Sequence, residues 1–163
     1  MPTVYVCDTN SLIDVYRHYP EIFRHLRKLV SKGSIKIPEG VRREIRDKSD
    51  KLRKTIDRWA EKYSEFVVYF KYDQRLRNTV VEVEGKYGEE IKVSKRCYNG
   101  FWKSPSGKRA ADGQVVAIGK VYGYTVVSDD RAVRLACMLE NVPCIGWAEF
   151  VRQIKGPEQL SLF

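Results

Sequence analysis

Four acidic residues stand where they could meet in a folded chain: Asp8, Glu44, Asp112 and Asp130. Asp8 and Asp130 each follow closely on a short apolar run that predicts a strand. Glu44 and Asp112 lie near the starts of stretches with helical periodicity. Carboxylates at strand ends and helix starts can converge at one edge of an α/β sheet, where ligands usually bind. The sequence therefore predicts an acidic site at that edge.

Such a cluster of like charges resists assembly unless a cation neutralises it. The hard oxygen ligands favour Mg²⁺ or Mn²⁺, which could support phosphodiester hydrolysis by making hydroxide and relieving charge on the phosphate. We expect Asp8, with Asp112 and Asp130, to hold the metal. Glu44 would act through water or deprotonate the nucleophile.

Each acid also has an ordinary structural interpretation. Asp8 could cap a helix, and Glu44 and Asp112 could be first-turn acids favoured by the helix dipole. One member of the pair Asp129 and Asp130 is expected to be only a cap. The catalytic interpretation therefore depends on the four acids occurring together.

Composition points to an anionic partner. The chain has 163 residues, which suggests one domain, and 30 Lys and Arg against 21 acidic residues give a formal charge of +9. A basic surface that attracts phosphate, around acids that hold metal, indicates a nucleic-acid substrate. The alternative is a solvated, charge-rich surface without a ligand.

Other classes of site receive little support. Four cysteines lack paired metal-ligand spacing and are expected to be mostly buried thiols, and only His18 and His25 are histidines. We expect no signal peptide, because a predicted strand begins almost at once, and no membrane span, because no apolar run approaches about 18 residues. We therefore expect a cytoplasmic protein without a membrane partner.

Helical and strand patterns alternate along the chain. We expect strands at 3–7, 35–37, 124–128 and 143–145, and helices before and after Pro20, then at 39–66, 76–87, 110–122, 131–140 and 148–155, with a loop at 97–109. This alternation predicts a parallel sheet covered by helices on both faces. Residues 1–155 would form a single domain, with 67–109 as an insertion or substrate loop and 156–163 as a C-terminal tail.

Four short motifs occur in an order typical of one nuclease family: Asp8-Thr9-Asn10, Val41-x-x-Glu44-Ile45, Ala111-Asp112-x-x-Val115-x-Ala117 and Val127-Ser128-x-Asp130. The chain resembles the PIN-domain nucleases over nearly its full length, most clearly at 3–46 and 109–151. The resemblance implies a PIN-like three-layer α/β/α fold with a central, mainly parallel sheet. It also implies a metal-dependent ribonuclease similar to the VapC-type toxins, with an antitoxin protein as a candidate partner; we also expect a homodimer.

The resemblance implies roles for supporting residues. Asn10 matches a small polar position at the exit of the first strand, and Ser128 the hydroxyl position before the fourth acid. Asp129 competes for that fourth place, and the Ser-x-Asp pattern favours Asp130.

Aromatic and basic residues precede Asp112 and could stack bases and hold phosphates. The residues expected to bind nucleic acid are Arg43, Trp102, Lys103, Lys108 and Arg109. The alternative is that Phe101 and Trp102 anchor their loop in the core.

The C-terminal tail suggests a further partner. Gln159 to Phe163 resembles the pentapeptide with which bacterial proteins dock on the sliding clamp of replication. Gly156-Pro157 would detach the tail from the last helix. The residues expected to reach the partner are Gln159, Leu160, Leu162 and Phe163. The alternative is packing on the chain's own domain or on a dimer mate.

These observations favour an RNA-cleaving toxin of a toxin–antitoxin pair. A DNA nuclease linked to replication or repair through the tail is the enzyme alternative. A nucleic-acid-binding module without catalysis is the alternative from another class, and a test of metal dependence separates it from both nucleases.

Overall fold

Five parallel strands form the centre of the fold, in the order β3-β2-β1-β6-β7. The computed structural model describes residues 2–48, 50–103 and 111–160, apart from the side chains of residues 48, 50 and 156–160. The strands are β1 (Tyr5–Cys7), β2 (Ile35–Pro38), β3 (Val67–Val68), β6 (Thr125–Val127) and β7 (Cys144–Ile145). All three residues of β1 are buried, as the apolar run at the start of the sequence predicts for a strand covered on both faces.

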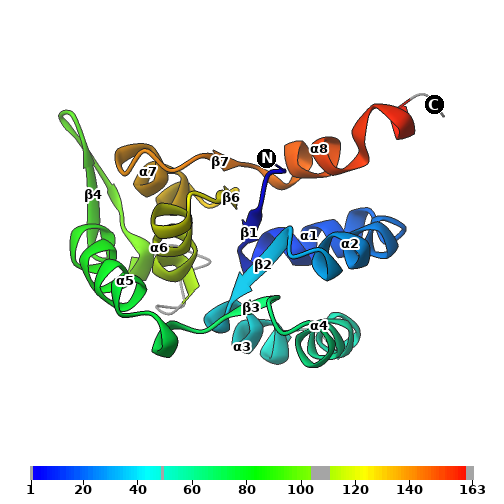
Figure 1. Cartoon of the computed structure of the whole chain (residues 1–163). Coiled ribbons are helices and arrows are strands. Elements are labelled where there is room, and N and C mark those ends of the chain that lie inside the picture. The colour runs from blue at the N-terminus through cyan, green and yellow to red at the C-terminus, as the bar shows by residue number, and fades with distance from the viewer. Residues whose placement is uncertain (1, 49, 104–110, 161–163) are drawn as a thin grey trace.

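Helices cover both faces of this sheet. They are α1 (Thr9–His18), α2 (Ile22–Ser31), α3 (Glu39–Lys48), α4 (Asp50–Lys62), α5 (Gln74–Tyr87), α6 (Ala111–Tyr122), α7 (Arg131–Leu139) and α8 (Trp147–Leu160). Figure 1 shows α1 to α4 on one side of β1 and β2, and α5 to α7 on the other. The expected α/β class with a parallel central sheet is confirmed. Among the described residues, no helix is both long and apolar enough to cross a bilayer.

Helix α6 is the central helix of the second layer. Its residues from Ala111 to Gly119 are buried except Gln114, because the helix packs on the sheet and on α5 and α7. A Cβ atom at Gly119 would lie 2.6 Å from Val142 Cγ1 and 2.8 Å from Val126 Cγ2. The small residue therefore allows α6 to approach the sheet closely. The helix ends as predicted at Gly123, which has a φ of 72°.

The prediction of a single helix at 39–66 is wrong. The segment forms α3 and α4, and Arg42 Nε lies 3.3 Å from Asp57 Oδ1. In one straight helix these residues would be about 22 Å apart along the axis, so the chain must fold back between them. Residues 46–51 are all polar, so the hydrophobic pattern carries no signal for a break between the two helices.

The prediction of a loop at 97–109 is also wrong for residues 97–103, most of which lie in regular elements. Strand β4 (Glu90–Val93) pairs antiparallel with β5 (Arg96–Asn99), and short 3₁₀ helices occupy Phe70–Tyr72 and Phe101–Lys103. The helix expected at 76–87 is confirmed as α5.

The last helix continues past the point where we expected it to end. Helix α8 runs to Leu160, so Gly156-Pro157 does not separate a tail from it. Residues 161–163 and the side chains of Gln159 and Leu160 lie outside the described residues. The hypothesis that these residues dock on a sliding clamp therefore rests on the sequence alone.

Candidate active site at the carboxyl edge of the sheet

The strand order changes direction between β1 and β6, and this point defines the candidate site. From β1 the chain builds the sheet towards β2 and β3, then returns to add β6 and β7 on the opposite side. Ligands of open parallel sheets bind beyond the carboxyl ends of the strands at such a switch point. Cys7 pairs with Val127 in register, so Asp8 and Ser128 emerge side by side at this edge.

Asp8 is buried at this position and bound through both carboxylate oxygens. Its Oδ1 accepts a 2.8 Å hydrogen bond from the Ser11 backbone N–H, and its Oδ2 accepts a 2.5 Å hydrogen bond from the Ser128 hydroxyl. Asp8 is thus the N-cap of α1, as its ordinary interpretation predicted. Burial raises the pKa of Asp8 to about 6, although the bonds from Ser128 and Ser11 lower it and the nearby Asp130 raises it slightly.

Glu44 is brought to the same region by a residue whose role the sequence did not reveal. The Thr9 hydroxyl donates a 2.5 Å hydrogen bond to Glu44 Oε2, and both side chains are buried. Since Thr9 follows Asp8 directly, this bond ties the carboxylate of α3 to the exit of β1. A Thr directly after the Asp at the end of a predicted strand is a sequence signal that could have indicated the contact.

Asp112 is buried in the first turn of α6. The start of α6 is held near the start of α3, because Gln114 Oε1 accepts a 2.9 Å hydrogen bond from the Gly40 N–H. A further acid that the sequence did not suggest lies beside it: Glu84 of α5 packs across Gly113, where an added Cβ atom would be 2.7 Å from Glu84 Cγ. Partial burial raises the pKa of Glu84.

Asp129 and Asp130 have different surroundings. Asp130 is the N-cap of α7, since its Oδ1 accepts a 3.1 Å bond from the Val133 N–H, and its own N–H donates to Ser128 Oγ at 3.1 Å. Of the two neighbouring acids, the one that caps α7 is therefore Asp130, which we expected to face the metal. Asp129 instead forms an ion pair with Arg134, 3.6 Å from Oδ1 to Nη1, and accepts a bond from the Trp147 N–H.

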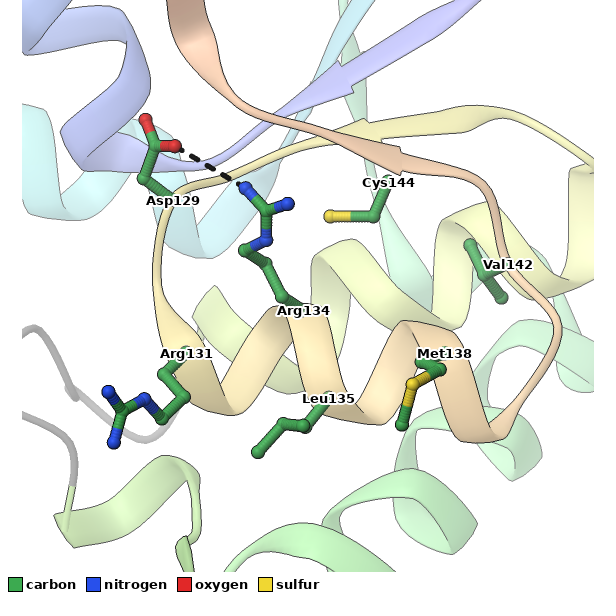
Figure 2. A pocket seen from close by; sticks show the side chains of 7 residues that line it. All are labelled: Asp129, Arg131, Arg134, Leu135, Met138, Val142 and Cys144. Atoms are coloured by element: carbon green, nitrogen blue, oxygen red, sulfur yellow. Dashed lines mark ion pairs between the residues drawn. The ribbon is translucent and has the colours of Figure 1, made fainter. Parts of the chain in front are cut away.

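Figure 2 shows Asp129 and Arg134 reaching towards each other beside a pocket between α7 and β7. The pocket has a volume of about 580 Å³ and is also lined by Met138 and Cys144. Asp129 therefore belongs to this pocket, whereas Asp130 shares Ser128 with Asp8.

The remaining predicted residues lie in varied settings. Asn10 is half-buried in the first turn of α1, and Arg43 is exposed on α3. Lys103 is paired with Glu89 at 3.5 Å. Lys108 and Arg109 lie outside the described residues.

The two aromatic residues before Asp112 pack inward to different degrees. Phe101 is fully buried against Tyr87, and their ring centroids are 6.3 Å apart. Trp102 is half-buried with its ring against Gly88, where an added Cβ atom would lie 2.7 Å from the indole. This arrangement agrees with the alternative that the two residues anchor their segment.

The donor set suits a hard divalent ion. Asp8, Glu44 and Asp112 are buried carboxylates, and the hydroxyls of Ser128 and Thr9 donate to Asp8 and Glu44 respectively. Within the described part of the chain, no three His, Cys, Asp or Glu side chains are grouped closely enough to hold one ion together. Proteins commonly bind Mg²⁺ through one or two carboxylates and several waters, and the buried Asp8 carboxylate would supply one such ligand here.

Solved structures of other proteins share this α/β/α fold with its mainly parallel central sheet. PAE2754 from Pyrobaculum aerophilum has a TM-score of 0.50 and 15% identity, covering 94% of this chain and 98% of its own. FitAB bound to an IR36 DNA fragment has a TM-score of 0.52 and 15% identity, and the match covers 88% of this chain and 95% of the FitAB chain. These likenesses confirm the expected fold.

A family assignment follows from the sequence as a whole. Residues 5–156 match the domain of unknown function DUF4411, and the chain belongs to this family. No curated protein sequence is significantly similar to the chain.

Proposed function

We propose that the chain is a metal-dependent nuclease that hydrolyses RNA at the β1/β6 edge, acting as the toxin of a toxin–antitoxin pair. The observation that carries the proposal is the convergence of Asp8, Ser128 and the Thr9–Glu44 pair at the switch point of the sheet. The formal charge of +9 supports a polyanionic substrate. The PIN-like fold and the order of the four acidic motifs support the toxin assignment.

Asp8 would be the principal metal ligand, with Asp112 or Asp130 as a second direct ligand and the other contributing through water. A bound Mg²⁺ or Mn²⁺ would supply a nucleophilic hydroxide and neutralise charge on the phosphate. Ser128 donates to the Asp8 carboxylate and would orient it, and Thr9 donates to Glu44, which would accept a proton from the attacking water. Burial of these groups strengthens their electrostatic effect on the reaction.

Cleavage of labelled single-stranded RNA tests the proposal. Cleavage should require Mg²⁺ or Mn²⁺, stop in a chelator, and be lost in Asp8→Asn. Asp14→Asn is a matched control, because it neutralises a carboxylate within α1, the helix that Asp8 caps. A fully active Asp8→Asn protein would overturn the mechanism, and binding without any metal-dependent cleavage would favour the non-catalytic module.

The same assay addresses the DNA alternative. DNA of the same sequence should be cleaved much more slowly than RNA if the chain is a ribonuclease. FitAB was solved with bound DNA, which makes this comparison necessary. Expression of the wild-type chain should arrest growth of the host cell, and Asp8→Asn should relieve the arrest.

A further inference from the structure

Helices α2 and α4 lie on the opposite side of the sheet from α5 to α7 (Figure 1), and basic side chains are concentrated on them. This surface contains a hollow of about 590 Å³ whose rim carries Arg24, Arg27, Lys28 and Arg58, and no carboxylate lines it. Within the described residues, none of these four cations forms an ion pair. All four side chains are exposed. The hollow is therefore a place where positive charge is concentrated and open to a ligand.

A second hollow continues this surface along α3 and α4. Its volume is about 580 Å³, and Arg58 lines both hollows. Together their walls carry seven cationic and two acidic side chains, a net charge of +5, more than half of the chain's +9. One of the acids, Asp57, already pairs with Arg42 at 3.3 Å and with Arg46 at 3.5 Å.

The aromatic residues that line the first hollow determine whether a base could stack there. Trp59 and Phe23 line it, but their exposed fractions are only 4% and 8%, and their rings stack on each other with centroids 5.7 Å apart. They offer little free face for a base. The exposed cations can instead neutralise phosphates, which carry no sequence information.

The surface is within reach of the candidate active site. Tyr16, which lines the first hollow, lies eight residues after Asp8 along α1, about 12 Å along the helix axis. A single strand of a few nucleotides can span such a distance. One nucleic-acid chain could therefore contact both places.

We propose that this surface, formed by α2 and α4, binds the phosphate backbone of single-stranded nucleic acid without regard to sequence. The inference rests on the proposed function, since it adds a second contact for the same substrate. Its role is to hold flanking phosphates while the carboxyl edge of the sheet engages the bond to be cleaved.

Binding can be measured without cleavage in the Asp8→Asn protein, using labelled RNA of about 12 nucleotides. Arg27→Ala combined with Arg58→Ala should weaken binding about tenfold and reduce the slope of log affinity against log salt by about 1.4. DNA of the same length and a second RNA sequence should show the same loss. Lys71→Ala combined with Lys95→Ala is the matched control, because it removes equal charge from exposed positions elsewhere.

Equal losses in the two double variants, with both proteins still folded by thermal melting, would overturn the proposed surface. This outcome would leave the nuclease assignment standing, because the Asp8→Asn protein would still bind RNA. Failure of the Asp8→Asn protein to bind RNA or DNA at all would overturn both the proposed surface and the nuclease assignment. A loss confined to one RNA sequence would contradict backbone recognition.

Discussion

The Ser128 hydroxyl donates a 2.5 Å hydrogen bond to Asp8 Oδ2, joining two residues that are 120 positions apart in the sequence. The parallel register of β1 and β6 makes the contact, because it places the residues after Cys7 and Val127 next to each other. The bond therefore couples the stability of the sheet edge to the orientation of the carboxylate that the proposed function needs.

Removing this bond should destabilise the protein. In Ser128→Ala the buried Asp8 oxygen loses its donor, and we expect a loss of about 1–3 kcal/mol in the free energy of unfolding. Urea unfolding at pH 7 in a chelator measures it. Ser31→Ala is the control, because the Ser31 hydroxyl bonds the Lys28 carbonyl at the surface and its loss should cost under about 0.5 kcal/mol. Equal effects would show that the Ser128–Asp8 bond contributes little.

Stability of the metal-free protein should depend on the ionisation of Asp8. Its pKa is raised to about 6 in the fold, above its ordinary value, so the folded state favours the neutral carboxyl group. That contribution is fully present below about pH 4 and is lost as the pH rises through about 6. Asn cannot ionise, so the stability of Asp8→Asn relative to wild type should grow by roughly 2–3 kcal/mol between pH 4 and 7.

Thermal and urea unfolding in a chelator across this pH range measure the difference. Mn²⁺ should selectively stabilise the wild type at pH 7, because it binds the ionised carboxylate in the folded state. A constant difference between the two proteins at all pH values would contradict the raised pKa. An equal effect of Mn²⁺ on both would contradict Asp8 as a ligand.

The strands that carry the site were predictable because β1 and β6 are short apolar runs that each lead into a polar residue. Their pairing could be inferred only from the alternation of helices and strands. The Thr9–Glu44 bond and the packing of Glu84 on Gly113 could not be inferred, since they depend on how α3 and α5 dock.

The hairpin of β4 and β5 was hidden for a local reason. Its turn includes Ser94 with a φ of 54°, so the usual Asn-Gly or Asp-Gly signal of a tight turn is absent. In β4 only Ile91 is fully buried, and the apolar alternation is correspondingly weak. Tertiary packing, rather than local propensity, sets this element.

Asparagine substitutions should distinguish Asp129 from Asp130. Asn caps helices about as well as Asp, so Asp130→Asn removes charge from the Ser128–Asp8 region while retaining the cap of α7. We expect RNA cleavage to fall at least about tenfold in Asp130→Asn, and to change little in Asp129→Asn, which loses the exposed pair with Arg134. Cleavage rates at saturating Mg²⁺ measure both. The reverse ranking would assign the fourth acid to Asp129.

Two glycines in the adjoining helices α6 and α5 should respond in opposite directions to alanine. At Gly113 an added Cβ atom would meet Glu84 Cγ at 2.7 Å beside Asp112, so Gly113→Ala must displace the Glu84 side chain or the first turn of α6. We expect a loss of about 1–3 kcal/mol in the free energy of unfolding, together with reduced RNA cleavage. At the exposed Gly85 nothing lies within 4 Å of an added Cβ, so Gly85→Ala should stabilise α5 by up to about 1 kcal/mol. Urea unfolding of both variants measures the two values.

Shortening residue 84 in a Gly113→Ala, Glu84→Ala double variant should recover most of the lost stability, and failure to do so would mean that the two residues are not in contact.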